Sequence, residues 1–395
     1  MRITIIAGAR PNFIKIAPII KALDKVKVER LFVKDASKLS YRLIHTGQHY
    51  DQKMSDTFFK ELNIPEPNAN LGCGGGSQAE QTAAIMVAFE KELLANPTDL
   101  VMVVGDVTST MACSIVAKKL NTKVAHVEAG IRSFDLTMPE EINRMVTDAL
   151  ADYFFTTTEL ANENLRKSGV HDEKIFFVGN VMIDTLLANR HRFKKPSVWN
   201  EIGLERGKYI VLTLHRPANV DGETHFEALL EAIIASSHDL PIIFPVHPRT
   251  AKIIESLYHL NSPSLSVTPT LPLTLSPSPS LPLPLPLSLH LIDPLGYLEF
   301  NYLVENAKVV ITDSGGITEE TTVMGVPCIT LRDNTERPET VTIGTNELIG
   351  INPASVKPAM DKLFSGTWKK GGIPSLWDGK AAERIVEHLS EIYGE

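Results

Sequence analysis

The chain alternates short apolar runs with segments of helical periodicity, and this alternation occurs twice. In the first half, runs of strand length lie at Ile3 to Ala7, Leu43 to Thr46, Leu100 to Val104, Val124 to Val127, Tyr153 to Thr156 and Ile175 to Val178. Strands that are apolar throughout and are joined by helices form parallel sheets covered on both faces. The first half is therefore predicted to be a doubly wound α/β domain.

A second domain is predicted after the polar stretch from Asn189 to Asn200. The alternation restarts with the apolar runs Tyr209 to Leu214 and Ile242 to Val246. A chain of 395 residues is long enough for two domains with separate cores. We place these domains at residues 1–185 and 186–375. Ligands of parallel sheets bind beyond the carboxyl ends of the strands, so two such sheets facing one another would form a cleft.

The charge and composition of the chain favour a small ligand. The formal net charge is −8 and the isoelectric point is near 5.9, so no basic field would attract nucleic acid or an anionic membrane surface. The three cysteines have no short spacing, so neither a disulfide framework nor a metal site is expected. No uninterrupted apolar stretch approaches the roughly 20 residues of a membrane-spanning helix. The first strand starts at Arg2, which leaves no room for a signal peptide, and we expect a cytoplasmic protein.

Residues 262–290 differ in composition from the rest of the chain, because they are almost wholly Leu, Pro, Ser and Thr. Repeated prolines remove backbone donors and favour extended conformations, so a helix or a central strand is not expected here. We interpret the segment as an insertion between a helix at Ile253 to Leu260 and a strand at Leu289 to Ile292. An inert surface loop and a Pro-rich ligand for a partner protein both fit this composition.

A helix start suited to an anion follows the apolar run Ala307 to Thr312. The segment Asp313 to Glu320, DSGGITEE, is predicted to turn through Gly315 and Gly316 into a helix. Backbone N–H groups at such a start, with no side chains in the way, bind phosphate. A further apolar run then leads into the charged segment Arg332 to Glu339, RDNTERPE. Together the two segments predict a nucleotide-sugar site.

Three carboxylates are candidates for proton transfer. Asp106 and Glu128 follow two of the predicted strands, and Glu140 precedes Arg144 by four residues at a helix start. Each also has a structural explanation: Asp106 as a helix cap, Glu128 as a partner of Arg132, and Glu140 with Arg144 as a surface ion pair. Carboxylates gathered at adjacent strand ends in a partly desolvated site would raise at least one pKa, which would give an acid and a base together.

Other ordered blocks extend along most of the chain. They are GARPNFIKIAPI near the start, TGQHYD from Thr46, GDVTST from Gly105, HVEAGIRS from His126, PEEINR from Pro139 and HRPAN from His215. With DSGGITEE and RDNTERPE, these blocks resemble the non-hydrolysing UDP-N-acetylglucosamine 2-epimerases, a family with the GT-B fold. The resemblance implies an α/β fold with two Rossmann-like domains facing across a cleft. It also implies a homodimer and a helix at residues 376–395 that packs back on the first domain.

The resemblance further implies a reaction at C2 of the sugar. Such enzymes interconvert UDP-N-acetylglucosamine and UDP-N-acetylmannosamine by eliminating UDP to give 2-acetamidoglucal and then re-adding UDP. No redox cofactor is needed, and the chain lacks the GxGxxG fingerprint of dinucleotide binders. The family's acid/base set falls on Asp106, Glu128 and Glu140, with Arg144 and His215 as electrostatic partners. For His215, a buried core histidine is the alternative.

The family's UDP contacts also fall on residues of this chain. They match Arg10, Lys15, Phe300, Ser314, Gly315, Gly316, Glu320 and Arg337. Glu320 is expected at the ribose hydroxyls and Phe300 at the uracil, with core packing as the alternative for Phe300. Gln48 and His247 match two contacts of an activating second UDP-N-acetylglucosamine, whereas Asp51 departs from that pattern.

Four alternatives remain open at this point. A hydrolysing relative would release free N-acetylmannosamine, but it is expected to lack the form GxRPxxIKxAP, which is present here as GARPNFIKIAP. The substrate could instead be a modified UDP-N-acetylhexosamine. A GT-B glycosyltransferase would not need three convergent carboxylates. A non-catalytic sugar-nucleotide sensor would be free to lose Asp106 or Glu128, and both are present.

Overall fold

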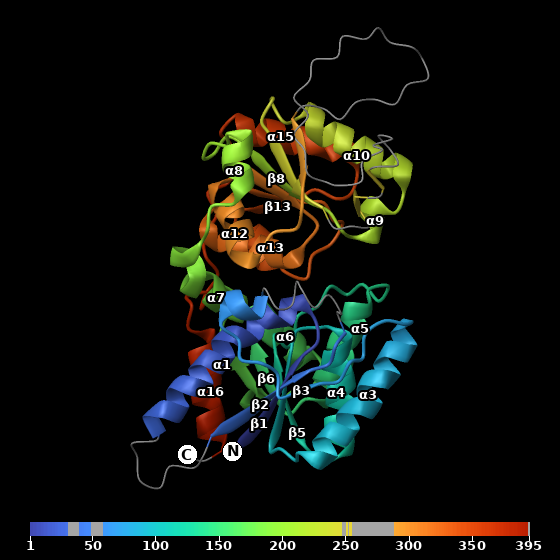
Figure 1. The fold of residues 1–395 in the computed structure, drawn as a ribbon, viewed down its shortest axis with the longest axis vertical. Coiled ribbons are helices and arrows are strands. Elements are labelled where there is room, and N and C mark those ends of the chain that lie inside the picture. The colour runs from blue at the N-terminus through green and yellow to red at the C-terminus, as the bar shows by residue number, and fades with distance from the viewer. Residues whose placement is uncertain (31–38, 49–57, 247–249, 252, 255–287, 394–395) are drawn as a thin grey trace. The chain divides into compact units, whose positions relative to one another are not determined.

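The computed structural model describes residues 1–30, 39–48, 58–246, 250–251, 253–254 and 288–393 (Figure 1). The chain forms two compact units. The first comprises Met1–His191 together with Pro374–Glu395, and the second comprises Arg192–Ile373. Each unit has its own parallel sheet and its own core.

Within the described residues, the first unit is built on a sheet of seven parallel strands in the order β3-β2-β1-β4-β5-β6-β7. The strands are β1 (Arg2–Ala7), β2 (Ser40–His45), β3 (Ala69–Asn70), β4 (Leu100–Val104), β5 (Lys123–Val127), β6 (Tyr153–Thr156) and β7 (Ile175–Phe177). Ile3 of β1 lies beside Tyr41 on one side and Leu100 on the other. The strand order reverses at β1, so the ends of β1 and β4 lie at the switch point where α/β sheets bind ligands.

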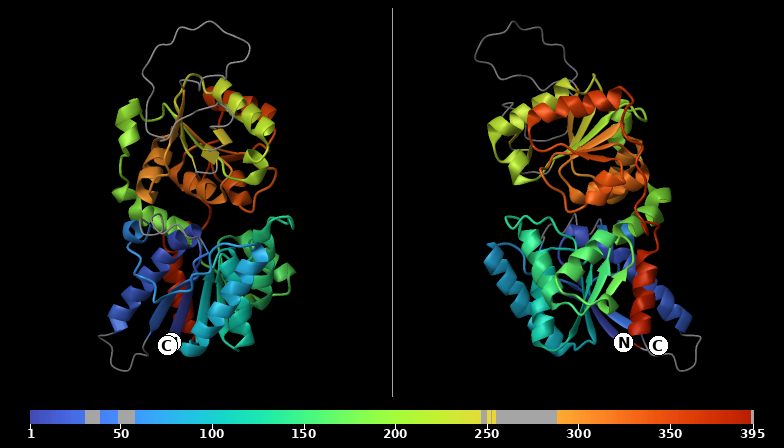
Figure 2. Two further views of the ribbon diagram at one scale, coloured as in Figure 1. Left: turned by 45° about the vertical axis from the view of Figure 1, so that its right-hand side comes forward. Right: turned by 180° about the vertical axis from the view of Figure 1, so that it is seen from behind.

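Helices cover both faces of this sheet. They are α1 (Arg10–Arg30), α3 (Gln78–Ala95), α4 (Thr108–Lys119), α5 (Pro139–Leu150), α6 (Glu159–Lys167), α7 (Val181–Asn189) and α16 (Ala381–Ile392), with 3₁₀ turns at Asp172–Lys174 and Arg190–Arg192. α1 packs against α7 and α16, whereas α4 packs against α3 and α5. Figure 2 shows the two groups on opposite faces of the sheet. Val101 and Val103 pack with Phe89 of α3 and Val116 of α4 in one apolar core.

α16 is anchored to the first unit at its start. The carboxylate of Asp184, on α7, accepts hydrogen bonds from the N–H groups of Ala381 and Ala382 at 3.1 and 2.7 Å. Trp377 donates its indole N–H to the carbonyl of Thr157. A carboxylate at a helix N-terminus satisfies free N–H groups and interacts favourably with the helix dipole. These contacts explain why the end of the chain belongs to the first unit.

The second unit has six parallel strands within the described residues, in the order β10-β9-β8-β11-β12-β13. The strands are β8 (Ile210–Thr213), β9 (Ile242–Pro245), β10 (Leu289–Ile292), β11 (Val309–Thr312), β12 (Cys328–Thr330) and β13 (Asn346–Leu348). Its helices are α8 (Ser197–Ile202), α9 (Pro217–Val220), α10 (Glu223–Ala235), α12 (Tyr297–Asn306), α13 (Gly315–Met324), α14 (Pro338–Thr342) and α15 (Val356–Phe364), with a 3₁₀ turn at Pro353–Ser355.

Successive side chains of β8 enter two different cores. Ile210 and Leu212 pack in the core that includes side chains of α10 and α15, whereas Val211 packs in the core that includes side chains of α8 and α12. Val310 of β11 joins the second core and Ile311 the first. Side chains alternate between the faces of a strand, so a strand buried on both faces must be apolar at every position.

The architecture confirms the α/β class predicted from the alternation of apolar runs. β10 lies where a strand was expected after the Pro-rich segment. The predicted helix at Ile253 to Leu260 and residues 262–290 lie mostly outside the described residues. All three cysteines are buried and free. Among the described helices, none is long and apolar enough to cross a membrane.

Replacing residues 264–287 by a short Gly-Ser turn is expected to leave the melting temperature unchanged or slightly higher. The replacement ends before β10 begins at Leu289, and halving a loop changes its closure entropy by only about 0.6 kcal/mol. Turnover should also be unchanged. Thermal melts and the Michaelis constant for a UDP-sugar, compared in the two forms, check this expectation. A large loss in either would show that the segment is an integrated part of the second unit.

Candidate active site

Asn12 ties together the backbone at the ends of β1 and β4. Its side-chain oxygen accepts hydrogen bonds from the N–H groups of Gly8 and Ala9, at 3.0 and 3.1 Å. Its amide nitrogen donates to the carbonyl of Val104 at 2.8 Å. These buried contacts fix the start of α1 against the end of β4. Asp106 follows two residues later.

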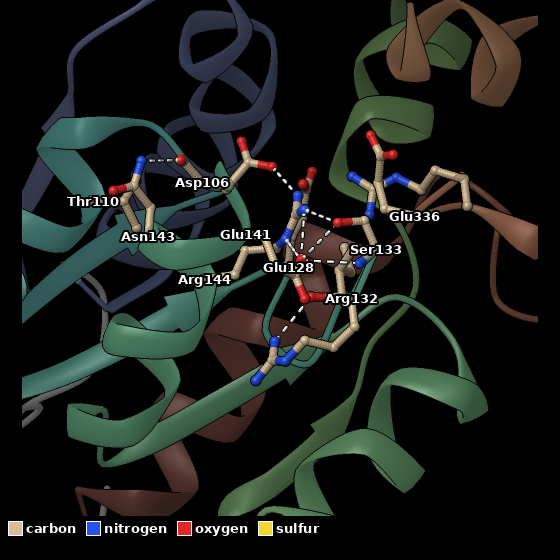
Figure 3. Close-up of polar contacts among 12 residues, drawn as sticks. Asp106, Thr110, Glu128, Arg132, Ser133, Glu141, Asn143, Arg144 and Glu336 are labelled. Atoms are coloured by element: carbon tan, nitrogen blue, oxygen red, sulfur yellow. Dashed lines mark hydrogen bonds and ion pairs between the residues drawn. The ribbon is translucent and has the colours of Figure 1, made fainter. Parts of the chain in front are cut away.

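Asp106 faces a buried guanidinium. Nη1 of Arg144, on α5, lies 2.5 Å from Oδ2 of Asp106 (Figure 3). Asn143 donates its side-chain amide to the backbone carbonyl of Asp106 at 2.8 Å. The Asp106 side chain is 27% exposed, whereas that of Arg144 is 2% exposed. Asp106 is not the predicted helix cap, because the N-cap residue of α4 is Val107. Asp106 is therefore a carboxylate held by a buried cation and still open to a ligand.

Glu141 holds Arg144 from the other side. Its Oε2 lies 2.9 Å from Nε and 2.8 Å from Nη2 of Arg144, and its carboxylate also accepts the N–H groups of Ser133 and Phe134. Burial alone would raise the pKa of Glu141, but the Ser133 N–H and the Arg144 guanidinium lower it below its ordinary value. The predicted partner of Arg144 was Glu140. That residue is exposed in the first turn of α5, and no ion pair joins it to Arg144 within the described chain.

Glu128 is paired with Lys15 and not with Arg132. Nζ of Lys15, on α1, lies 2.6 Å from Oε2 of Glu128, and both side chains are buried. The φ angle of Glu128 is 69°, in the left-handed region that is uncommon for residues other than glycine. Gly105 has the same φ, and a Cβ on it would lie 3.0 Å from Nζ of Lys15. Backbone strain of this kind persists only where neighbouring contacts hold it, and it clusters at functional sites.

The two carboxylates thus face separate cations, Asp106 facing Arg144 and Glu128 facing Lys15. They follow neighbouring strands, because β4 pairs with β5. Cations fixed beside proton-transfer groups can stabilise negative charge that develops on a ligand. The raised carboxyl pKa that was expected from crowding of like charges stays a prediction. Among the described residues, no group of His, Cys, Asp and Glu side chains could hold a metal ion.

In the second unit, Asp313 organises the segment that follows β8. Its carboxylate accepts the N–H groups of His215 and Arg216 at 3.0 and 2.9 Å and the side-chain amide of Asn219 at 3.1 Å. Nδ1 of His215 lies 2.6 Å from Oδ1 of Asp313. Burial would raise the pKa of Asp313, but His215 and the backbone N–H groups lower it. His215 is not a buried core histidine: its side chain is 58% exposed and is oriented by a buried carboxylate.

α13 begins at Gly315, and Ser314 is its N-cap residue without a side-chain cap. The predicted turn through two glycines is therefore the first turn of the helix itself. The first N–H groups of a helix have no partners within it, so they are available to an anion. A Cβ on Gly315 would lie 2.8 Å from Oε1 of Glu336 and 3.8 Å from Nη1 of Arg332. A glycine at this position lets these two charged side chains approach the helix start.

Arg332 and Glu336 form a largely buried ion pair, with Nη2 and Oε2 2.6 Å apart. Nε and Nη1 of Arg332 are buried and have no hydrogen-bond partner within the described residues. Arg337, the cation predicted for the diphosphate, has its Nε 2.7 Å from Oε1 of Glu319 on α13. The cation that the structure places beside Gly315 is therefore Arg332, which was not among the predicted site residues.

The Arg332–Glu336 pair is expected to make folding sensitive to acid. Burial would raise the pKa of Glu336, but Arg332 and Arg337 lower it to about 2 from an ordinary 4.5. A lowered folded-state pKa gives stability that is present above about pH 4.5 and is lost as the pH falls toward 2. The contribution is on the order of 3 kcal/mol.

The matched comparison is the double variant Arg332→Met/Glu336→Gln, which removes both charges. Between pH 7 and pH 3, its free energy of unfolding in urea should fall by less than that of the wild type. An equal fall in the two proteins would show that Glu336 is not an ionised, stabilising group in the folded state.

The two residues predicted for the nucleoside, Glu320 and Phe300, lie on α13 and α12. Glu320 is buried in α13 and accepts the hydroxyl of Tyr297 at 2.9 Å. Burial raises the pKa of Glu320 to about 7, against the lowering effect of the Tyr297 hydrogen bond. Phe300 is partly buried and packs against the core that contains Leu303 and Val310. The ribose and uracil contacts stay predictions.

The residues predicted for an activator are only partly described. Gln48 directs its side-chain oxygen to the start of α4, 3.2 Å from N and 2.9 Å from Oγ of Ser109. His247 and Asp51 lie outside the described residues. Arg10 begins α1, but its side chain also lies outside the described part. The activator role of Gln48 and the phosphate role of Arg10 stay predictions.

Comparison with known proteins identifies the family. A family described as UDP-N-acetylglucosamine 2-epimerase matches residues 32–390. The chain belongs to this family. It is 40% identical over 403 residues to the UDP-N-acetylglucosamine 2-epimerase of Methanocaldococcus jannaschii, with 100% of both chains covered. It is 35% identical to the UDP-2,3-diacetamido-2,3-dideoxy-D-glucuronate 2-epimerase of Pseudomonas aeruginosa, with 99% of this chain and 100% of that relative covered.

Solved structures of epimerases share the fold. The crystal structure of the Methanocaldococcus jannaschii UDP-GlcNAc 2-epimerase in complex with UDP-GlcNAc and UDP matches with a TM-score of 0.82 at 39% identity and covers 99% of this chain and 100% of that one. The enzyme from Neisseria meningitidis bound to UDP-GlcNAc matches with a TM-score of 0.82 at 27% identity, with the same coverage. The predicted GT-B-like class, with two parallel-sheet domains, is confirmed for this 2-epimerase chain.

Three charged residues of the candidate site were not among the predicted site residues: Glu141, Arg332 and Glu336. Glu141 lies three residues before Arg144, and a spacing of three places side chains on one helix face as well as a spacing of four does. That signal was available in the sequence. Arg332 and Glu336 are also four residues apart in the sequence. They lie outside the helices, where a separation of four residues does not place two side chains on one face. Their approach to Gly315 depends on how β12 and α13 pack.

Proposed function

We propose that this 2-epimerase interconverts UDP-N-acetylglucosamine and UDP-N-acetylmannosamine without net hydrolysis. The observation that carries the proposal is the presence of two carboxylate–cation pairs beyond adjacent strands, Asp106 with Arg144 and Glu128 with Lys15. The family model and the relatives named above support the sugar nucleotide as substrate. The first block, GARPNFIKIAP, has the form expected of the non-hydrolysing type.

The proposed chemistry is elimination followed by addition. C2 of the sugar has no neighbouring carbonyl that could stabilise a carbanion. A carboxylate therefore takes the C2 proton as the bond between C1 and the UDP oxygen breaks, which gives 2-acetamidoglucal and UDP. In the reverse addition, UDP returns to C1 and a carboxylic acid delivers a proton to the opposite face of C2. Two carboxyl groups on opposite sides of the sugar suit this sequence, one as base and the other as acid.

Asp106, Glu128 and Glu140 are the proposed acid/base set. Asp106 is partly exposed, Glu140 is exposed and Glu128 is buried against Lys15. The two accessible carboxylates are the simpler donors and acceptors of a substrate proton. Glu128 would contribute either directly, after Lys15 turns to the substrate, or by holding Lys15 beside the leaving group.

UDP is proposed to bind the second unit at the start of α13. The N–H groups of Gly315 and Gly316 in the first turn would meet the diphosphate, whereas the N–H group of Ser314 already donates to Oγ1 of Thr312 at 3.0 Å. The two nitrogens of Arg332 that lack described partners support a role for this cation beside them. Departure of UDP places negative charge on the β-phosphate, which His215 can stabilise while Asp313 orients its ring.

Product analysis tests the proposed function. Incubation of the protein with UDP-N-acetylglucosamine should give a mixture with UDP-N-acetylmannosamine, separable by anion-exchange chromatography. Stoichiometric release of free N-acetylmannosamine and UDP would assign the hydrolysing type instead. Turnover of neither kind would overturn the assignment of this substrate.

A modified sugar is the second candidate, favoured by one observation. The Pseudomonas aeruginosa relative at 35% identity carries the name of an epimerase for a diacetamido glucuronate. Parallel assays with UDP-N-acetylglucosamine and UDP-2,3-diacetamido-2,3-dideoxy-D-glucuronate distinguish the two. We expect the higher kcat/KM with UDP-N-acetylglucosamine, because the relative named for it covers the whole chain at 40% identity.

A further inference from the structure

Both ring nitrogens of His126 face oxygen atoms. Nδ1 lies 2.6 Å from Oδ1 of Asp148 and Nε2 lies 2.9 Å from the carbonyl oxygen of Gly105. A carbonyl oxygen only accepts, so Nε2 carries a proton. On the other side of the ring, Nδ1 lies against a carboxylate oxygen, which accepts when the carboxylate is ionised. The ring is fully buried on β5. Both ring nitrogens of His126 are therefore engaged, one by the Asp148 carboxylate and the other by the Gly105 backbone.

Asp148, on α5, has further contacts on its other oxygen. Oδ2 accepts the N–H group of Gly130 at 3.1 Å and lies 2.6 Å from Nη1 of Arg132. Burial would raise the pKa of Asp148, but His126 and Arg132 lower it, which keeps the carboxylate ionised. One continuous buried network thus runs from the carbonyl of Gly105 through His126 and Asp148 to the N–H group of Gly130.

Both ends of the network hold left-handed backbone. Gly105, with φ 69°, directly precedes Asp106. Gly130, with φ 77°, lies two residues after Glu128, whose own φ is 69°. Conformations of this kind are strained for Glu128 and are readily lost unless surrounding bonds fix them. The network therefore ends close to each carboxylate in the chain. It bonds to the backbone of Gly105 and Gly130 and not to Asp106 or Glu128 themselves.

Burying charged groups such as Asp148 and Arg132 is costly, and apolar side chains would fill the same space at no greater cost in stability. The network therefore contributes to the geometry of the site more than to stability. We propose that His126 and Asp148 are positioning residues that hold Asp106 and Glu128 in their catalytic positions. This inference rests on the proposed epimerisation, which assigns the two carboxylates their roles. His126 acts on the Asp106 side and Asp148 on the Glu128 side.

Two variants of His126 separate its two hydrogen bonds. The amide nitrogen of Asn matches Nδ1, so His126→Asn keeps the donor to Asp148 and loses the donor to Gly105. The amide nitrogen of Gln matches Nε2, so His126→Gln keeps the donor to Gly105. Misplacing a reacting group by about 1 Å can lower a rate by about 10²-fold. We expect His126→Asn to lower kcat by roughly that factor and His126→Gln to lower it clearly less.

Three readouts accompany kcat in this experiment. KM and the affinity for UDP should stay within about twofold of the wild type in both variants, because UDP is proposed to bind the second unit. Amide hydrogen exchange should speed up in peptides covering residues 105–110 for His126→Asn and residues 128–133 for Asp148→Asn. Exchange requires no turnover, so it tests the positioning even if the proposed reaction is wrong. Absence of wild-type turnover would overturn the proposed function alone.

Several results would overturn the inference. One is a His126→Asn protein that exchanges like the wild type at residues 105–110. Another is an equal loss of kcat in the Asn and Gln variants that simply follows their melting temperatures, which would indicate a structural role. If the His126 variants do not fold, Asp148→Asn serves in their place, with faster exchange at residues 128–133 and a lower kcat at unchanged KM expected. Unchanged exchange and kcat in that variant would contradict the proposal.

Discussion

Asp106→Asn should lower turnover of UDP-N-acetylglucosamine by at least about 10²-fold, the usual loss when general acid/base help is removed. The substitution keeps the shape of the side chain and an oxygen that can accept from Arg144. Glu128→Gln, which likewise keeps an acceptor for Lys15, should have a loss of similar size. UDP binding measured by calorimetry should be retained in both, because the diphosphate is proposed to bind the second unit.

A matched control for the first substitution is Asp172→Asn. Asp172 is an exposed carboxylate of the first unit, paired with Arg166 on the surface. Its loss should leave turnover and UDP affinity unchanged. Turnover of Asp106→Asn or Glu128→Gln close to the wild-type rate would remove that residue from the mechanism.

The double variant Arg332→Met/Glu336→Gln should fold but bind UDP roughly 10- to 100-fold more weakly. A hydrogen bond to a charged group contributes about 1.5–3 kcal/mol, and each 1.4 kcal/mol is a factor of ten in affinity. Replacing both partners avoids leaving a single buried charge without its partner, which alone costs about 3–5 kcal/mol. Calorimetric titration with UDP measures the effect.

The control for this pair lies on the surface of the same unit. Lys357 and Asp361 form an exposed pair, also four residues apart, on α15. Lys357→Met/Asp361→Asn should bind UDP as the wild type does. If the Arg332 and Glu336 double variant also binds UDP normally while its melt shows it folded, Arg332 is a structural cation and the diphosphate site lies elsewhere.

The fold was predictable because its strands are buried on both faces. In β8, Val211 enters one core while Ile210 and Leu212 enter the other, so three successive positions are apolar. Such runs are visible in a sequence without knowledge of the partner strands. The order of strands was not predictable in the same way, because it depends on which apolar runs pair and on the path of each helix.

The site was predictable in its residue types and less so in its contacts. Asp106 and Glu128 were selected because they follow strands, and the structure places them after the carboxyl ends of two adjacent parallel strands, β4 and β5. Their partners come from α5 and α1, and sequence separation gives no indication of such contacts. Arg144 illustrates this: Glu140 and Glu141 lie four and three residues before it, and both spacings allow contact on a helix. The hydrogen bond that Glu141 accepts from the Ser133 backbone accompanies its pairing with Arg144.

His126 shows a second limit of prediction from the sequence. A histidine within the apolar strand β5 is visible in the sequence, but its role depends on the buried carboxylate of Asp148, which lies on α5. Buried charges are paired through tertiary packing, and their partners cannot be read from spacing along the chain. The same reason explains why Glu128 was given Arg132 as its alternative partner when Arg132 instead binds Asp148.

Deuterium incorporation at C2 distinguishes elimination and re-addition of UDP from other routes to the epimer. The protein is incubated with UDP-N-acetylglucosamine in deuterated water, and C2 is followed by NMR. Elimination and re-addition pass the C2 proton to a carboxyl group that exchanges with solvent, so both UDP-N-acetylglucosamine and UDP-N-acetylmannosamine should acquire deuterium at C2. Epimerised product that keeps its original C2 proton, or the absence of any exchange at C2, would contradict elimination and re-addition through an exchangeable carboxyl group.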